Sequence, residues 1–417
     1  MQNKGGVVGN SFSKLFIFFA MACSFCITFE YGIIRPTSNA YFVSIFGASM
    51  YPYVWIATIP LNFCVISLYN RFLPKVGCLS MFYAASLSVV GINLLAYSCI
   101  EKAPWIAFLH YIWKDIYILW MFKQLWSLVH STIDTKKAKY IYGLLFGIGG
   151  FGSVMGASIP TAFAVSLGSR FLFLFSLPIY CMLLLAYRGA LSTSKKVYGF
   201  QETFSPSMKN AFSLVMKTRF LTYILFLVVS MQVSVAFIEY NFNFYLEHTI
   251  ASVDLRTEYC GYIMRLVNIC TTSFQLLGGF LFIQFFGVKY VHRMIPMVLG
   301  CQVIYCFFYP SFASISSSFI AAKSIDHSVF GIAREMLYIP LSHEEKFRAK
   351  AVIDVFAYRS AKGIASVSLI GMQAIFQERF LGAMHYLSMM IFTMWLIATV
   401  LMFQKSSLPE TAKPSLQ

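Results

Sequence analysis

Charged side chains stand inside stretches of this sequence that are otherwise apolar. Residues 334–363 read REMLYIPLSHEEKFRAKAVIDVFAYRSAKG and place Asp354, Arg359 and Lys362 where the surrounding residues predict a membrane helix. A charged side chain that faces lipid near the middle of a bilayer costs about 3 kcal/mol. Charges at this depth therefore have to pair or to line a wet cavity, and both arrangements mark a candidate binding site.

Thirteen charged residues fall within the predicted spans, and exposing all of them to lipid would cost on the order of 40 kcal/mol. They are Glu30, Lys114, Asp115, Lys123, Glu239, Arg265, Lys323, Asp326, Arg334, Glu335, Asp354, Arg359 and Lys362. Several lie near span ends, where snorkelling makes a charge cheap: Lys114, Asp115, Arg265 and Glu335. At a rise of 1.5 Å per residue, three lysines lie roughly 15 Å from a span end, near the midplane. These are Lys123, Lys323 and Lys362.

Helical spacing predicts a face for the deeper charges. Polar residues recur every four positions in one stripe: Asp354, Tyr358, Lys362 and Ser366. The preceding span places another set broadly on one side: Lys323, Asp326, His327 and Arg334. Two alternatives stay open here. Lys323 and Asp326, three residues apart, could neutralise each other, and His327 fits a packed histidine better than a proton relay.

The three deep lysines, with Arg35 and Arg334 toward the two mouths, predict a cationic path suited to an anion. Phosphate-bearing metabolites fit, because Lys and Arg are their natural ligands. A primary pump is disfavoured, since the sequence has no G-x-x-x-x-G-K-[ST] phosphate loop. A membrane-embedded enzyme would need a convergent nucleophile or metal site, and a receptor or scaffold would not need three lysines at one depth. We therefore expect a transporter and no enzyme.

The elements that must hold these residues are membrane helices. The chain has 417 residues, is 59% hydrophobic and only 12% charged, and has a mean hydropathy of +0.70, which excludes a soluble or disordered class. A lone segment in lipid must satisfy its own backbone polar groups, which requires helices. Apolar runs of about 17 to 25 residues predict twelve spans. They centre on residues 15–34, 52–69, 78–99, 113–130, 140–165, 171–187, 220–242, 259–286, 294–310, 313–337, 351–376 and 387–403.

Lys and Arg in the connections predict the topology. With the N-terminus placed in the cytoplasm, the inner segments hold twenty of these residues and the outer segments five, so both termini are expected inside. The formal charge of +16 is mostly this topology signal, and we expect the lipid bilayer but no nucleic acid as a partner. The ten cysteines lie mostly within spans and have no metal-ligand spacing. No metal and no cofactor are expected.

The spans divide six and six around a basic connection. A shift of 211 residues sets KQLW at 123–126 on REML at 334–337, and KAK at 137–139 on RAK at 348–350. A shift of 209 sets Glu30 on Glu239. The sequence therefore predicts an all-α membrane protein of two pseudo-symmetric six-helix bundles, at residues 1–190 and 220–417, joined by a cytoplasmic basic linker at 191–219. This arrangement is major-facilitator-like, with a substrate site between the bundles.

The motifs resemble the ATP:ADP antiporter family, the nucleotide transporters of obligate intracellular bacteria and plastids. REMLYIPL at 334–341 resembles the family's KEMAYIPL, and KFRAKAVIDV at 346–355 resembles K-x-K-G-K-A-A-I-D-V. AKG at 361–363 stands for G-K-S-G, QLW at 124–126 for E-L-W, and EYGIIRPTSNAY at 30–41 for N-Y-T-I-L-R-D-T-K-D. AKYIYGLLFGIGG at 138–150 resembles A-K-x-F-Y-x-L-F-G-x-G. The resemblance runs from the first span to the last.

The resemblance implies four substrate-binding positions, of which two match. Glu239 stands for the family's glutamate in the seventh span and Lys362 for the lysine of G-K-S-G. Ser38 stands where the family has a lysine and Gln124 where it has a glutamate, so one cation and one anion are lost together. Lys123 is a candidate replacement cation, although it points about 100° away from Gln124.

The resulting expectation is a carrier for an anionic, ATP- or ADP-like nucleotide that works by alternating access, with altered specificity or coupling. The alternative is a carrier for another phosphorylated or organic anion. Candidate binding residues are Arg35, Ser38, Lys123, Gln124, Glu239, Lys323, Arg334, Asp354, Tyr358 and Lys362. Exchange and proton symport both stay open, and Glu30 and Glu239 are the candidate acids for symport. The resemblance implies the inner membrane of an obligate intracellular bacterium. The sequence is silent on oligomeric state, and a monomer is our working expectation.

Overall fold

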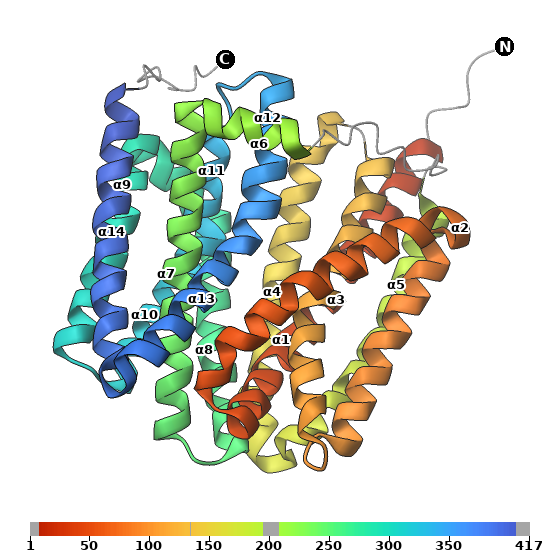
Figure 1. The fold of residues 1–417 in the computed structure, drawn as a ribbon. Coiled ribbons are helices and arrows are strands. Elements are labelled where there is room, and N and C mark those ends of the chain that lie inside the picture. The colour runs from red at the N-terminus through yellow and green to blue at the C-terminus, as the bar shows by residue number, and fades with distance from the viewer. Residues whose placement is uncertain (1–7, 134, 195–207, 406–417) are drawn as a thin grey trace. The chain divides into compact units, whose positions relative to one another are not determined.

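The computed structural model describes residues 8–133, 135–194 and 208–405, and within them the chain is helical with no strand. The order of elements is α1 Val8–Phe46, η1 Ala48–Met50, α2 Tyr51–Cys99, α3 Pro104–Thr132, α4 Thr135–Leu167, η2 Ser169–Phe175, α5 Ser176–Thr193, α6 Met208–Lys217, α7 Arg219–Thr249, α8 Val253–Ser273, η3 Phe274–Gly278, α9 Gly279–Phe308, α10 Phe312–Ile325, η4 Asp326–Phe330, α11 Gly331–Leu337, α12 His343–Lys350, η5 Ala351–Ala357, α13 Tyr358–Phe376, η6 Gln377–Arg379 and α14 Phe380–Lys405 (Figure 1). Three short elements are π-helices, namely η3, η4 and η5. The prediction of an all-α membrane protein is confirmed.

Within the described residues, seven helical stretches are long and apolar enough to cross a membrane. Two of them, at Ala48–Cys99 and Ser360–Gln404, each cover two of the predicted spans, so the seven account for nine. The remaining predicted spans correspond to α3, to α8 with the segment that follows it, and to α10 with η4 and α11. These are the helices that carry Lys123, Arg265 and Lys323. The number of twelve spans therefore remains a prediction. The three spans that the apolar criterion does not identify are the ones that carry these charged residues.

Backbone breaks recur at the offset of the sequence repeat. Gly77 has a φ of +79° and divides α2, and Gly287, 210 residues later, has a φ of +75° and divides α9. Gly168 and Gln377, 209 residues apart, have φ values of +83° and +44°. A Cβ at Gly77 or Gly287 would meet nothing within 4 Å, so the backbone conformation, and not crowding, favours glycine there. The two halves of the chain thus turn at equivalent places.

The chain forms two compact units. The N-terminal unit comprises the described residues of Met1–Gly47, Pro60–Gln201 and Ile250–Ile269, and the C-terminal unit those of Ala48–Ile59, Glu202–Thr249 and Cys270–Gln417. The first turns of α2 belong to the C-terminal unit, and most of α8 belongs to the N-terminal unit. The predicted division at 1–190, 191–219 and 220–417 does not include this exchange. It stays a prediction, and part of its linker lies outside the described residues.

In the N-terminal unit, α1 packs against α3, α4 and α5. Small residues bring α1 and α4 together, since a Cβ at Gly152 would lie 2.8 Å from the carbonyl oxygen of Phe25. A Cβ at Gly156 would collide with the carbonyl oxygen of Phe29. Close backbone approach of this kind replaces the hydrophobic driving force that is missing between helices in lipid. It fixes the face that α1 turns toward α2 and α3.

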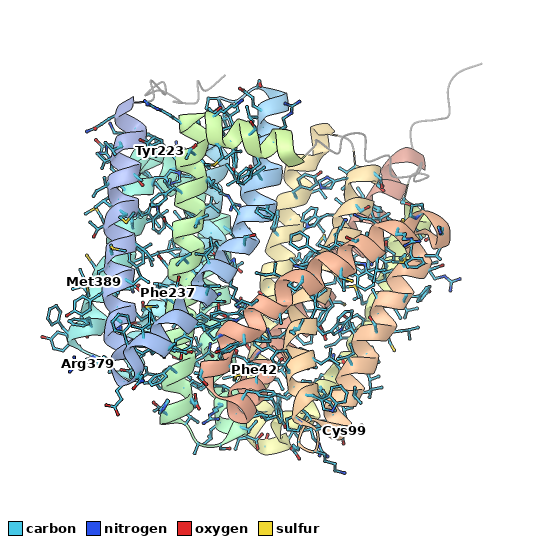
Figure 2. All side chains as sticks on the ribbon, viewed as in Figure 1. Phe42, Cys99, Tyr223, Phe237, Arg379 and Met389 are labelled. Carbon is cyan, nitrogen blue, oxygen red and sulfur yellow. The ribbon has the colours of Figure 1, made fainter. Side chains whose placement is uncertain are left out.

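In the C-terminal unit, α7 packs against α10, α13 and α14, and α9 packs against α14 (Figure 1). The side chains along α7 are largely buried, among them Phe237 (Figure 2). Phe242 of α7 stacks on Phe319 of α10 with ring centroids 4.5 Å apart. The helix α7 is thus the central element of this unit, and polar groups on it are held within its core.

Local sequence fixes where the site-bearing helices begin. Ser311 precedes α10 and forms a capping box with Ser314, each side chain bonding the other's backbone N–H at 3.1 Å. Ser342 and Glu345 form the same arrangement before and within α12. Pro104 occupies the first position of α3, where its missing N–H costs nothing.

Candidate functional site

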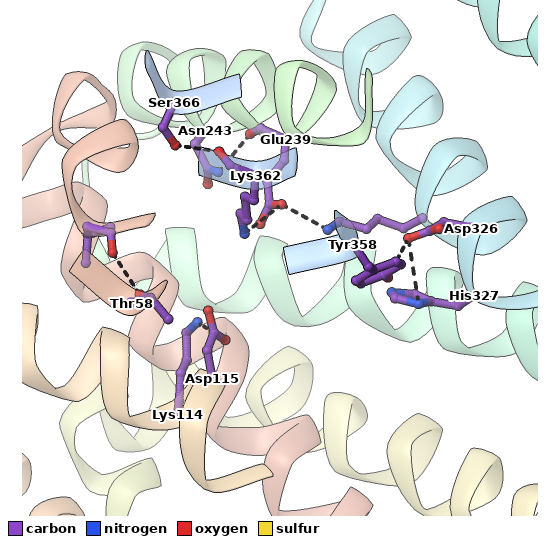
Figure 3. Close-up of polar contacts among 12 residues, drawn as sticks. Thr58, Lys114, Asp115, Glu239, Asn243, Asp326, His327, Tyr358, Lys362 and Ser366 are labelled. Carbon is purple, nitrogen blue, oxygen red and sulfur yellow. Dashed lines mark hydrogen bonds and ion pairs between the residues drawn. The ribbon is translucent and has the colours of Figure 1, made fainter. Parts of the chain in front are cut away.

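Two lysines converge on one carboxylate in the C-terminal unit (Figure 3). Nζ of Lys323, on α10, donates to Oε2 of Glu239, on α7, at 2.9 Å. Nζ of Lys362, on α13, donates to the same oxygen at 3.5 Å. The side chains of Lys323 and Glu239 are 9% and 10% exposed, whereas that of Lys362 is 32% exposed. The cluster carries one net positive charge, and Lys362 is its accessible member.

Neighbouring polar side chains donate hydrogen bonds to the backbone of this cluster. Asn243 donates to the carbonyl oxygen of Glu239 at 2.8 Å, and Ser366 donates to that of Lys362 at 2.8 Å (Figure 3). Lys362 Nζ also lies 4.4 Å from the centroid of the Trp55 ring, at the start of α2. Trp55 is fully buried and holds the ammonium group without neutralising it. The lysine is therefore positioned but remains available to a second anion.

A second polar cluster surrounds Asp326, where α10 gives way to the π-helix η4. Gln232 of α7 donates to Oδ1 at 2.8 Å, and the hydroxyl of Tyr358 donates to Oδ2 at 3.2 Å. The ring of His327 lies 4.0 Å from Oδ2 and is more exposed (Figure 3). The structure decides against the alternative in which Lys323 pairs with Asp326, because Lys323 donates to Glu239. Neutral donors hold Asp326 instead.

A third cluster joins α11 to η5. Arg334 Nε lies 3.5 Å from Oδ1 of Asp354, and the hydroxyl of Tyr338 donates to the same oxygen at 2.9 Å. Lys350 donates to Glu335 at 2.6 Å nearby. The guanidinium of Arg334 also lies 5.8 Å from the centroid of the Tyr358 ring, which links this cluster to the one at Asp326.

The predicted stripe of Asp354, Tyr358 and Lys362 thus reaches three different partners. Asp354 meets Arg334, Tyr358 meets Asp326, and Lys362 meets Glu239. The π-helix η5 precedes Tyr358, and its wider turn changes the angular phase that a regular α-helix would keep. The side chain of Arg359 lies outside those described. The residues form a ladder of polar contacts along the unit, with Lys362 at the end that holds the charge cluster.

The candidates of the N-terminal unit are spread over separate contacts. Lys123 donates to Asn70 at 2.8 Å and lies 5.0 Å from the ring centroid of Tyr69. Arg35 lies 5.9 Å from the ring centroid of Tyr31. Ser38 is buried, with its hydroxyl 2.9 Å from Nδ1 of His110. Gln124 is buried, and within the described part of the chain neither amide atom has a hydrogen-bond partner.

Several residues of these clusters were not predicted from the sequence. Trp55, Gln232 and Tyr338 contact predicted site residues, but an aromatic or amide residue in a chain with 18% aromatic content gives no distinct signal. His110 and Asn93 form part of a buried network in the N-terminal unit. Polar residues within or beside predicted spans were the available signal for both of them. Among the residues that the structure describes, no group of three or more His, Cys, Asp or Glu side chains is placed to hold a metal ion.

Comparisons with known proteins bear on the whole chain and on this site. The model of the TLC ATP/ADP transporter family matches residues 282–406, the segment that contains Lys323 and Lys362. ADP,ATP carrier protein 3 of Rickettsia bellii (strain RML369-C) is 22% identical, over 85% of this chain and 86% of its own. The solved structure of the nucleoside transporter NupG aligns with a TM-score of 0.67 at 14% identity, covering 94% of this chain and all of that chain. A bacterial homologue of the iron transporter ferroportin aligns with a TM-score of 0.67 at 9% identity, covering 93% and 98%. The two structures support the major-facilitator-like fold alone.

Proposed function

We propose that the chain is a divergent member of the ATP:ADP antiporter family, that it is a secondary transporter of an anionic nucleotide, and that the lysine pair on Glu239 forms part of its binding site. The protein is an integral membrane carrier and not an enzyme. The observation that supports the site is the convergence of Lys323 and Lys362 on one buried carboxylate.

The charge arithmetic of this cluster suits reversible anion binding. Removing a partner from a buried ion pair leaves an uncompensated charge and costs roughly 3–5 kcal/mol. Lys323 neutralises Glu239 at the shorter distance. The side chain of Lys362 can therefore turn from Glu239 to a phosphate, and the carboxylate stays paired with Lys323. Glu239 then recaptures Lys362 when the substrate leaves. A carrier needs this balance because tight binding in either state would stop turnover.

The remaining candidates are proposed for each unit by itself. We assign Arg334, Asp354 and Tyr358 to the C-terminal bundle's polar ladder, and Arg35 and Lys123 to the N-terminal bundle's share of the cationic path. Ser38 and Gln124 stay uncharged candidates, and both are buried in this conformation. Compared with the family's motifs, this sequence lacks one cation and one anion, so the net charge of the path keeps its sign. The number of charged side chains that the family uses for ATP/ADP exchange is smaller. Altered specificity or coupling follows from this loss.

Alternating access provides the mechanism. The bundles at residues 1–190 and 220–417, joined by the basic linker at 191–219, would move as the two repeated units of such a carrier. Both termini would lie in the cytoplasm, because that orientation places twenty of the Lys and Arg residues of the connections on the cytoplasmic side and five on the other. An inner membrane of an obligate intracellular bacterium is supported by the similarity to the Rickettsia carrier.

The same lysine pair could take another phosphorylated or organic anion, which is the second candidate function. A phosphate group satisfies Lys362 whatever it is attached to. The test is uptake by purified protein in proteoliposomes, with labelled ADP, ATP and other nucleotides compared with labelled sugar phosphates. We expect nucleotide uptake that unlabelled nucleotides inhibit. Uptake of a sugar phosphate with no nucleotide uptake would replace the first function with the second.

A further inference from the structure

A closed hydrogen-bonded network lies in the N-terminal unit around Glu30 of α1. Asn93 Nδ2, on α2, donates to Oε1 of Glu30 at 3.2 Å, and the hydroxyl of Tyr117, on α3, donates to Oε2 at 2.8 Å. The oxygen of the Asn93 amide lies 2.8 Å from Nε2 of His110, and Nδ1 of His110 lies 2.9 Å from the hydroxyl of Ser38. The members of this network are each no more than 1% exposed.

The network has one consistent direction. Because Asn93 donates its N–H to Glu30, its carbonyl oxygen faces His110, and Nε2 of the ring must then carry hydrogen. Nδ1 is left as an acceptor, so Ser38 donates to it. In this series of hydrogen bonds every hydrogen therefore points toward Glu30, and Tyr117 donates a second hydrogen bond to the carboxylate. This pattern suits an ionised carboxylate.

The ionised form nevertheless lacks a counter-charge. Within the described residues no basic side chain pairs with Glu30, and the groups that face it are the amide of Asn93 and the phenols of Tyr117 and Tyr180. The nearby Lys114 is already paired with Asp115 at 2.8 Å, on α3, and that carboxylate also accepts from Tyr31. His110 reaches Glu30 only through Asn93. A buried charge without a partner is expensive, and binding a proton removes that cost.

The internal sequence repeat allows Glu30 to be compared with Glu239. The shift of 209 residues that superposes Glu30 on Glu239 gives the two carboxylates equivalent places in their halves. Among the described residues, Glu239 pairs with Lys323 and Lys362, whereas Glu30 accepts hydrogen bonds from neutral donors. Equivalent acids with opposite surroundings have different uses. One competes with an anion for a lysine, and the other is suited to exchange a proton.

We propose that Glu30, with its network to Asn93, His110 and Tyr117, is the proton-binding site of a proton-coupled carrier, a proposal that rests on the transport function proposed above. The proton comes from water on one side, binds a carboxylate oxygen of Glu30 and leaves to water on the other side, with no bond to the substrate. It offsets part of the negative charge that moves with the nucleotide.

Proton binding would act on the contacts between helices. Once Glu30 is protonated, one of its oxygens carries hydrogen and faces a donor, either the Asn93 amide or the Tyr117 hydroxyl. That bond must reverse or break, so the state of Glu30 sets how α1 is joined to α2 and α3. The same helix carries Arg35 and Ser38. The network is closed to water in this conformation, which prevents a leak and requires α1 to move before the proton exchanges.

The experiment measures proton and nucleotide movement together. Full-length protein is reconstituted with a pH-sensitive dye inside the vesicles, and labelled ADP is added outside. We expect ADP to acidify the lumen in the parent protein and in the control Glu101→Gln, whose carboxylate lies at an exposed pair with Arg170. In Glu30→Gln, acidification falls to the level of protein-free vesicles while equilibrium exchange of labelled ADP persists. Unchanged acidification in Glu30→Gln, or loss of exchange together with acidification in a correctly folded variant, would overturn the proposal.

A second measurement does not depend on transport. Infrared difference spectra recorded on acidification should show a protonated carboxyl band that is present in the parent protein and in Lys362→Met, and lost in Glu30→Gln. Glu30→Asp keeps the acid and should keep a band, which separates titration from a packing defect. If the parent protein moves no nucleotide, the proposed function fails, and the infrared spectra alone decide the proton site. A Glu30→Gln spectrum that keeps the whole protonated-carboxyl absorption of the parent protein refutes the assignment, since the other carboxyl groups also absorb there and only the Glu30 component should be lost.

Discussion

Replacing Lys362 with methionine removes the accessible cation of the Glu239 cluster and keeps most of the side-chain volume. Lys362 is 32% exposed and lies 3.5 Å from Glu239, so it can turn to a phosphate. A hydrogen bond to a charged group contributes about 1.5–3 kcal/mol. At 1.4 kcal/mol for each factor of ten, Lys362→Met should weaken ADP binding roughly ten- to hundredfold. Values near the lower end are expected, since binding also gives up the contact with Glu239.

The assay is equilibrium binding of labelled ADP to protein in detergent, with a thermal melt of each variant to confirm folding. Lys289→Met is the matched control, because it replaces lysine with methionine on α9, outside the cluster. We expect the control to bind ADP as the parent does. Parent-like affinity in a folded Lys362→Met protein would show that the cluster does not bind the nucleotide.

Three further predictions concern stability. Glu239→Gln should destabilise the protein by about 3–5 kcal/mol because two lysines lose their counter-charge. Adding Lys323→Met should recover a large part of the lost stability in a thermal melt. If the effects of the two substitutions are additive in the double variant, the coupling is disproved. Gly77→Ala should lower, and Gln377→Gly should raise, the stability by roughly 1–2 kcal/mol, because both positions have positive φ; a melt in which both changes act alike would contradict this. The pKa of Glu345 is lowered by hydrogen bonds from its capping serine, so its contribution to the start of α12 is present above the unfolded pKa and is lost as pH falls through the folded pKa. The protection factors of the α12 amides, taken relative to the intrinsic exchange rate at each pH, should fall on acidification in the parent and not in Glu345→Gln.

The helical class and most of the spans could be predicted because the signal is local. A run of about twenty apolar residues predicts a membrane helix whatever it packs against. The break at Gly77 agrees with this reading, since the sequence already separated the spans at 52–69 and 78–99. The π-helix at Ala351–Ala357 could not be predicted in the same way. It depends on how the residues before Tyr358 pack in the unit, and it redirects the stripe that regular spacing predicted.

The site shows the same division between local and long-range information. Depth in a span singled out Lys323 and Lys362, and resemblance to a family singled out Glu239 and Lys362. Their meeting on one oxygen joins residues 84 and 123 positions apart, and no local pattern encodes such a contact. The i, i+3 spacing left Asp326 open as an alternative partner of Lys323. Tertiary packing decided otherwise, because α7 brings Glu239 within 2.9 Å.

The two halves of the chain repeat their backbone more closely than their chemistry. Turns at Gly77 and Gly287 demand a positive φ, which nearly all side chains resist, so the repeat can change little there. A buried carboxylate has more freedom, because either a cation or a set of neutral donors can satisfy it. Glu239 has the cations and Glu30 the neutral donors. The proton-coupled carrier that we propose uses this difference, because it binds the anion in one half and the proton in the other.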